Sequence, residues 1–259
     1  MSRLIFLLAA ALLAPQATQV EITNEPHHHL VFENQSIRVF NVEVDPNTET
    51  QMHWHRHDYF AVTLAPAEIA NTVLDKPAVT TKLTEGDVRF ASATFAHSVR
   101  DVGPEPFRNV TVEILEDATL RNSPAKWDAG KNDAGKNDAG KNDAGKSDAG
   151  KSDDRGLEVL PNGTAQILFV KDGVRATEFE LQPGGVVPMH HHSGPHLLIA
   201  VTDLDVRSDV KSDSPSGPQG PMPAHFKSGD SKWLPANYSH TITNTGTKPG
   251  KFVTLEFPE

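Results

Sequence analysis

The sequence predicts an all-β protein made of two β-barrels that are joined by a low-complexity linker. Short runs of about four to eight residues, rich in Val, Ile, Thr and Phe, alternate with turns of Gly, Pro, Asn and Asp. Long helical periodicity is absent after the N-terminal segment, and the two halves of the chain align with each other. With 259 residues, 37% of them hydrophobic, the chain is long enough for two packed domains.

The N-terminal segment has the features of a cleavable secretory signal. Arg3 supplies a positive charge, and residues 4–14 form an apolar run that is too short to span a bilayer comfortably. Ala14 and Ala17 offer cleavage points. We therefore expect residues 1–17 to be a signal peptide and the mature protein to be periplasmic or secreted, without a membrane partner. An uncleaved anchor and a buried helix are the alternatives.

The middle of the chain consists of five tandem copies of Asp-Ala-Gly-Lys-(Asn/Ser), over residues 128–152. Because this tract has no large apolar residue, it cannot bury a core, and we expect a flexible, solvated linker. The predicted organisation is an N-terminal barrel over residues 18–127, the linker over residues 128–154 and a C-terminal barrel over residues 155–259.

The overall charge and the absence of cysteine exclude several kinds of partner and site. The formal net charge is −10, and no basic patch offsets it, which argues against nucleic acid as a partner. The chain has no cysteine, so disulfides, thiolate metal sites and cysteine nucleophiles are excluded. Any metal ion must therefore be held by histidine and oxygen ligands.

The two halves repeat the same pattern. Residues 31–64 align without a gap with residues 168–201, and residues 86–114 align with residues 229–257. The matched histidines are His53 with His190, His55 with His192 and His97 with His240. An affinity tag would have no counterpart in the other half, so the histidine-rich run after Met189 belongs to the fold.

Strand geometry predicts that the histidines of the second half converge. Side chains at positions i and i+2 share one face of a strand, so His190 and His192 point the same way, and His196 keeps that parity. His240 follows on a neighbouring strand. Buried imidazoles are costly to desolvate without a partner, and neutral imidazole suits Fe, Mn, Ni, Cu or Zn. We therefore predict a metal site of these four histidines; the alternative is histidines without an ion.

The same residues resemble the two motifs of the cupin superfamily, His-x-His-x3-(Glu or His) and Gly-x5-Pro-x-Gly-x2-His-x3-Asn. In the second half, Gly229, Pro235, His240 and Asn244 match the second motif, with Asn237 where Gly is usual. The chain therefore resembles a bicupin. This resemblance implies two jelly-roll barrels and a metal ion bound by the motif histidines.

The first half departs further from these motifs. His53, His55 and His97 occupy the three histidine positions, whereas Tyr59 stands where the fourth ligand would be and Asp101 replaces Asn. The resemblance includes cupins that use only histidine ligands, so three imidazoles are sufficient for a metal ion. A degenerate half that serves stability or assembly is the alternative.

Four further residues are candidates for lining the pockets. Tyr59 and His57 belong to the first half, and His57 has inward parity but aligns with Gly194. Phe90 and Trp233 are equivalent in the two halves, and their simplest interpretation is as core aromatics that border the pockets.

Other polar residues are expected to have structural roles. Glu113 and Glu256 are equivalent; we expect ion pairs with Arg38 and Arg175, and a base near the metal is the alternative. Residues 27–29 are three consecutive histidines that precede the first barrel strand, and we expect a solvated or packed arm.

The resemblance implies a metal-dependent enzyme. Four protein ligands on an octahedral ion leave two positions for a substrate, water or oxygen. We expect dioxygenase-like or oxidase-like chemistry on a small oxygenated molecule, with Fe or Mn preferred and Ni, Zn or Cu possible. A non-catalytic periplasmic module that binds or senses a small ligand is the alternative, and a storage-like structural bicupin is a third. The sequence assigns no catalytic residue, and it fits a monomer or a homo-oligomer.

Overall fold

The computed structural model describes residues 18–115, 151–152, 157–171 and 173–258. The expected signal peptide, residues 1–17, and most of the predicted linker lie outside the described residues. Within the described ranges, no helix has the length and apolar character needed to cross a membrane.

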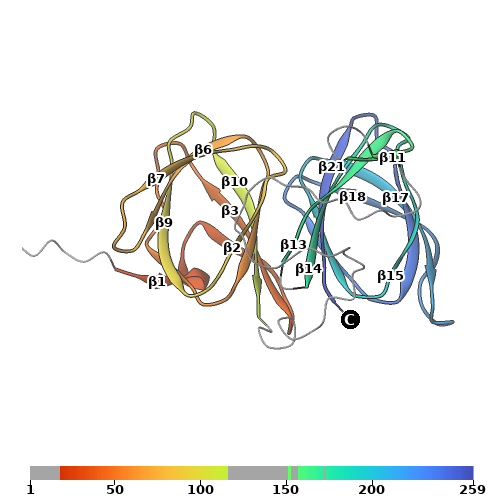
Figure 1. The fold of residues 1–259 in the computed structure, drawn as a ribbon, viewed down its shortest axis with the longest axis horizontal. Coiled ribbons are helices and arrows are strands. Elements are labelled where there is room, and N and C mark those ends of the chain that lie inside the picture. The colour runs from red at the N-terminus through yellow and green to blue at the C-terminus, as the bar shows by residue number, and fades with distance from the viewer. Residues whose placement is uncertain (1–17, 116–150, 153–156, 172, 259) are drawn as a thin grey trace, which may run out of the picture.

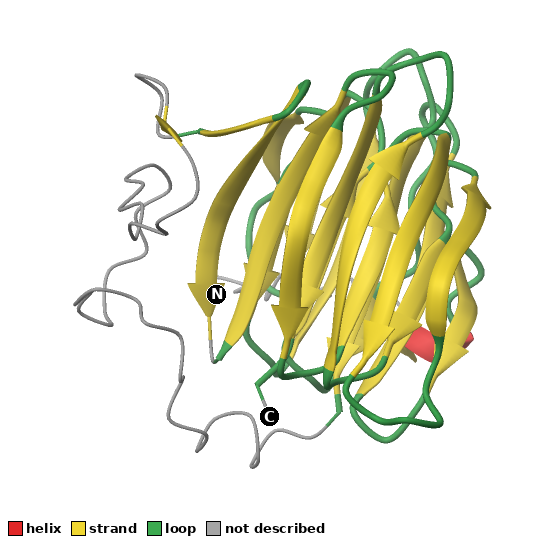
Figure 2. Cartoon of the chain, turned by 90° about the vertical axis from the view of Figure 1, so that its right-hand side faces the viewer, coloured by secondary structure: helices red, strands yellow, loops and turns green. Residues whose placement is uncertain are grey.

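The described structure is built almost entirely of strands, which confirms the all-β prediction (Figures 1 and 2). The helical element is one turn of 3-10 helix, η1 (Ile22–Asn24). The strands of the first barrel are β1 (Val20–Glu21), β2 (His28–Glu33), β3 (Ile37–Val44), β4 (His53–His55), β5 (Tyr59–Thr63), β6 (Ala67–Val73), β7 (Val79–Leu83), β8 (Val88–Ala91), β9 (Phe95–Asp101) and β10 (Phe107–Ile114). The strands that follow are β11 (Lys151–Ser152), β12 (Glu158–Leu160), β13 (Gly163–Lys171), β14 (Val174–Leu181), β15 (Val186–His192), β16 (His196–Ala200), β17 (Leu204–Ser212), β18 (Gln219–Phe226), β19 (Ser231–Leu234), β20 (Tyr238–Asn244) and β21 (Gly250–Glu256).

Each barrel consists of two sheets that face each other. The first barrel has the strand orders β1-β4-β9-β6-β7 and β2-β3-β10-β5-β8. The second has β15-β20-β17-β18 and β11-β12-β13-β14-β21-β16-β19. The pairing is antiparallel except between β1 and β4. Strands that neighbour each other in a sheet are often far apart in the chain, as in a jelly roll, and the order β13-β14-β21-β16-β19 repeats β2-β3-β10-β5-β8.

The last residues of the repeat tract form a strand. Lys151 pairs with Val159, and Ser152 pairs with Glu158, so β11 extends the edge of the second barrel beside β12. The predicted linker thus contributes two residues to a sheet, because an edge strand offers unpaired backbone groups to any extended segment beside it.

The two barrels are held together by an apolar core between their facing sheets. In Figure 1, β2, β3 and β10 of the first barrel lie beside β13 and β14 of the second. Ile37 and Val39 of β3 belong to the shared core, whereas Phe40 and Val42 point into the first barrel. Fully or almost fully buried members of the shared core are Ile37, Val39, Phe60, Val62, Val110, Val112, Val174, Ala176, Leu197, Ile199, Val253 and Leu255. The facing sheets are therefore buried on both sides.

The aromatic residues Phe90 and Trp233 lie in this shared core. The Phe90 ring centroid is 5.2 Å from that of Phe60, and the Trp233 ring stacks on Phe32 at 6.4 Å. Phe60 also stacks on Phe169 of the other barrel at 5.9 Å. The structure thus places Phe90 and Trp233 between the barrels and not beside the histidines. They lie on β8 and β19, at the edges of the two facing sheets.

The non-histidine residues of the second motif build turns. Gly229 has φ +96 and Asn237 has φ +61, in the left-handed region that favours glycine and tolerates asparagine. Asn244 is buried, and its amide nitrogen donates to the carbonyl oxygens of Leu181 and Lys248, both at 2.9 Å. These turns fix the strand that carries His240.

Candidate metal centres

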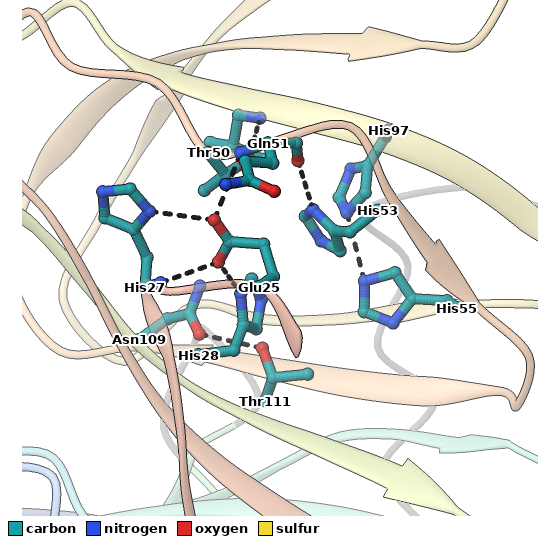
Figure 3. A network of polar contacts seen from close by, with 11 residues as sticks. Glu25, His27, His28, Thr50, Gln51, His53, His55, His97, Asn109 and Thr111 are labelled. Carbon is teal, nitrogen blue, oxygen red and sulfur yellow. Dashed lines mark hydrogen bonds and ion pairs between the residues drawn. The ribbon is translucent and has the colours of Figure 1, made fainter. Parts of the chain in front are cut away.

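Four histidine rings meet inside the first barrel (Figure 3). His53 and His55 lie on β4 and His97 lies on β9, while His28 lies on β2 in the opposite sheet. One ring nitrogen from each of His28, His53 and His55 lies within 4.8 Å of the other two. Nε2 of His55 also lies 3.1 Å from Nε2 of His97. His97 lies outside this group of three nitrogens and joins the cluster through His55 and through His53, whose ring centroid is 4.6 Å from its own.

His28 is a member of the cluster that sequence reasoning missed. The sequence assigned residues 27–29 to an arm, but His28 is part of β2 and its side chain is only 6% exposed. It lies outside the aligned repeat, so no counterpart pointed to it. The available signal was strand parity, because His28 lies at even spacing from Leu30 and Phe32, although a bulge after Leu30 breaks that alternation.

Hydrogen bonds fix the proton on Nδ1 of two rings in the first barrel. Nδ1 of His53 lies 2.8 Å from the carbonyl oxygen of Gln51, and Nδ1 of His97 lies 2.8 Å from Oδ1 of Asn71. An oxygen that only accepts requires the ring nitrogen to donate. Nε2 of each ring therefore carries the lone pair that a metal ion would use.

Glu25 is the buried acidic partner of this cluster. Its Oε2 lies 2.6 Å from Nδ1 of His28, its Oε1 lies 2.9 Å from Nδ1 of His27, and it accepts hydrogen bonds from the backbone N–H groups of His27 and Gln51. Burial by itself raises the pKa of Glu25, but the hydrogen bonds from His28 and His27 outweigh it and hold the pKa at about 2. Glu25 is therefore an ionised acceptor that keeps the proton of His28 on Nδ1.

Three histidine rings meet inside the second barrel. His190 and His192 of β15 flank His240 of β20, whose Nε2 lies 3.1 Å from Nε2 of each. Nδ1 of His190 lies 2.8 Å from the carbonyl oxygen of Pro188, and Nδ1 of His192 lies 3.0 Å from Oε1 of Glu256. Nε2 of His190 and Nε2 of His192 therefore carry lone pairs, and both point toward Nε2 of His240.

His196, predicted as the fourth ligand, lies beside this cluster and outside the group of converging nitrogens. Its ring stacks on His192, with centroids 3.9 Å apart and planes at 21°. Its Nε2 lies 3.2 Å from the hydroxyl of Tyr238. In the first barrel, Tyr59 stacks on His55 in the same way, at 4.0 Å and 21°. The structure therefore gives the fourth motif position the same stacking arrangement in both barrels.

The converging nitrogens fit a metal ion. Burial lowers the pKa of His53 to about 4 and of His240 to about 3, so both rings are neutral near pH 7. Nε2 of His240 lies 3.1 Å from the Nε2 atoms of both His190 and His192, and a single proton on it can serve only one of these two lone pairs, whereas a cation between the rings serves all three nitrogens. Two nitrogens at right angles around an ion, each at about 2.1 Å, would be about 3 Å apart. Nε2 of His53 is also buried and makes no hydrogen bond with any described residue.

A carboxylate held by arginine lies behind each cluster, as the sequence predicts. Glu256 forms an ion pair with Arg175 on the side away from the histidines. Glu113 forms an ion pair with Nη1 of Arg38 at 3.2 Å, and its Oε1 lies 3.6 Å from Nδ1 of His55. Such partners orient a ligand ring and raise its basicity.

The remaining pocket candidates lie in the first barrel. Tyr59 is buried against His55, and burial raises the pKa of its hydroxyl, so the phenol stays protonated. His57 lies between β4 and β5, and its Nδ1 is buried without a hydrogen bond to the described residues. Tyr59 therefore borders the first cluster as a protonated phenol.

No protein-family model and no curated protein matches this chain. Solved structures do. The Lactobacillus farciminis oxalate decarboxylase in its formate complex matches with a TM-score of 0.57 at 15% identity, over 96% of this chain and 88% of that one. A variant of the Bacillus subtilis oxalate decarboxylase matches with a TM-score of 0.56 at 14% identity, over 91% and 76%. The chain has the cupin jelly-roll fold. The two histidine clusters are suited to bind metal ions.

Proposed function

We propose that the chain is a metal-dependent bicupin enzyme whose reactive centre is the three-histidine cluster of the second barrel. The observation that supports this most directly is the convergence of Nε2 of His190, His192 and His240 beside the Tyr238–His196 pair. A divalent transition metal, with Fe or Mn preferred and Ni, Zn or Cu also compatible with imidazole, would supply Lewis acidity or redox capacity there.

The side chains around this centre can bind and orient a small oxygenated molecule. Three protein ligands leave the remaining coordination positions of the ion to such a molecule. His190 is only partly buried, so the cluster has a side toward solvent. Burial raises the pKa of the Tyr238 hydroxyl, which keeps it protonated as a hydrogen-bond donor. Burial lowers the pKa of His196 to about 2, so its ring is neutral and can accept a proton.

Small carboxylates are the substrate class to test first. Solved structures that share the fold over most of this chain include oxalate decarboxylases, which act on a small dicarboxylate. Because one fold hosts many chemistries, this likeness supports a class and not a single compound. Oxidative chemistry on 2-oxo acids, diketones or catechols belongs to the same proposal.

A non-catalytic module that binds or senses a small ligand is the second candidate. The observation that favours it is that Glu256, the carboxylate beside the cluster, already forms an ion pair with Arg175 and a hydrogen bond with His192. It therefore does not offer a free general base. In this alternative the metal ion would orient a ligand without turnover.

The two candidates are separated by metal analysis and turnover of the untagged protein. The protein would be loaded with Fe(II) or Mn(II) and supplied with oxalate, 2-oxo acids, diketones and catechols, while formate, CO2 and oxygen uptake are recorded. We expect turnover that His240→Ala abolishes and His225→Ala retains, since His225 is an exposed histidine paired with Asp205. Metal binding without turnover across the panel would favour the binding module, and the absence of metal binding would exclude both.

The signal-like segment supports a periplasmic or secreted location. Residues 1–17 combine a positive charge, an apolar run and small residues near the expected cleavage point. Fractionation of cells that express the full chain, with N-terminal sequencing of the product, tests this; a cytoplasmic protein that keeps residues 1–17 would contradict it.

A further inference from the structure

We propose that the first barrel holds its cation through four histidines, with His28 as the fourth ligand, and that this centre is closed to substrate. The inference rests on the proposed metal binding and concerns a residue outside the two cupin motifs. It makes the two centres unequal: four protein ligands in the first barrel and three in the second.

His28 reaches the cluster from the sheet opposite to the other ligands. Its ring centroid lies 4.6 Å from that of His53 and 6.3 Å from that of His55, and its ligand nitrogen lies within 4.8 Å of theirs. His97 adjoins this group of three through the 3.1 Å contact between its Nε2 and that of His55. The side chain of His28 is almost completely buried, whereas its neighbour His29 is exposed on the other face of β2. The position of His28 is therefore that of a ligand and not of a surface residue.

Glu25 and Gln51 hold the rings of His28 and His53 in place. Glu25 accepts from Nδ1 of His28, and the backbone N–H of Gln51 donates to Oε1 of the same carboxylate at 3.1 Å. The carbonyl oxygen of Gln51 accepts from Nδ1 of His53 at 2.8 Å. Figure 3 shows this chain of contacts, with Glu25 between the two histidine-bearing segments. Both Nε2 atoms are thereby left free and oriented before any cation binds.

The second barrel has no histidine at the corresponding position. His28 pairs with Val42 in the first barrel, and at the same register of the second barrel Ala165 pairs with Phe179. The second centre also includes the partly exposed His190. The four rings of the first centre are each at most 6% exposed, so the coordination positions that they leave on an ion face protein and not solvent. Such closed sites are typical of structural metal ions, whereas catalytic sites keep a position open. The first centre is therefore expected to bind its ion more tightly and to stabilise the fold.

The test measures metal affinity in untagged, metal-free protein by calorimetric titration with Co(II). The wild-type chain is expected to bind two equivalents. In a His190→Ala background, which weakens the second centre, one tight equivalent remains. Adding His28→Ala to this background is expected to lower the affinity of that equivalent by at least about tenfold, and Glu25→Gln by about 10–100-fold.

The matched control is His29→Ala in the same background, because it removes a neighbouring histidine whose side chain is exposed. Urea unfolding of each metal-free variant shows whether it folds; if His28→Ala does not, His28→Gln and Glu25→Gln decide the question by the same titration. An affinity for His28→Ala equal to that for His29→Ala would overturn the proposal. Loss of all binding in His190→Ala would also overturn it, because the first centre would then bind no ion, but the proposed metal function of the second centre would still stand. Absence of Co(II) binding by the wild-type chain would instead refute the proposed metal function.

Discussion

Oε1 of Glu256 lies 3.0 Å from Nδ1 of the metal-centre residue His192. The equivalent carboxylate in the first barrel, Glu113, lies farther from its histidine, at 3.6 Å from Nδ1 of His55. A carboxylate that accepts from a ligand ring fixes the tautomer and makes Nε2 a better donor to a metal. The shorter contact predicts that the second centre depends more on Glu256 than the first does on Glu113.

We expect Glu256→Gln to lower the metal affinity of the second centre by about 10–100-fold, because the neutral amide is a weaker acceptor for His192. Calorimetric titration of the metal-free variant measures this. Glu180→Gln is the control, since Glu180 points to the opposite face of the sheet by strand alternation. Equal affinities for the two variants would show that the carboxylate does not support the ligand.

The shared core predicts that the two barrels unfold together. Phe60 is fully buried and contacts both Phe90 of its own barrel and Phe169 of the other. Phe60→Ala is expected to lower the free energy of unfolding by about 3–5 kcal/mol. Val79→Ala, at a position that is 61% exposed, should cost less than about 0.5 kcal/mol. Urea unfolding followed by fluorescence and circular dichroism tests this, and two separate transitions would contradict a shared core.

The metal-free protein is expected to lose stability as the pH falls from 7 to 5. Burial lowers the pKa of His53 to about 4 and of His240 to about 3 in the folded protein, whereas both are near 6.5 in the unfolded chain. Below pH 6.5 the unfolded chain therefore binds protons that the folded chain does not. The free energy of unfolding should fall by about 2 kcal/mol for each such ring at pH 5, and the loss continues down to the folded pKa.

Urea unfolding at both pH values, in the presence of a chelator, measures this loss. His240→Asn removes one of the buried titrating rings and should show a smaller difference between pH 7 and pH 5. Equal stability of the metal-free wild-type protein at the two pH values would mean that protonation of the buried rings does not lower the free energy of unfolding.

The internal repeat made the fold and most of the histidine clusters predictable. Two copies of one pattern showed which histidines belong to the fold, and strand parity placed His190 and His192 on one face. Parity assigns a side chain to a face, but it does not give distances across a sandwich of two sheets. For this reason the sequence did not distinguish a ligand from a stacking neighbour at His196, and it did not place His28 against a strand of the other sheet.

The packing of the barrels on each other was not predictable from the sequence. Phe90 and Trp233 are aromatic residues on short strands, and nothing in their spacing distinguishes a pocket from an interface. The structure shows that the outer faces of β3, β5 and β10 are apolar and buried, so these strands need a second sheet outside their own barrel.

The two roles open to His196 give opposite expectations for metal content. If His196 stacks on His192 and bonds to Tyr238, as in the structure, then His196→Ala keeps the metal of the second centre, whereas His240→Ala loses it. Turnover of His196→Ala should still fall by about 10²–10⁴-fold, the usual effect of removing a proton acceptor beside the reacting molecule. Metal content after dialysis and turnover of the loaded protein are measured on the same samples. If His196→Ala loses its metal as completely as His240→Ala does, His196 is a ligand, and its ring must turn from Tyr238 toward the ion when the ion binds.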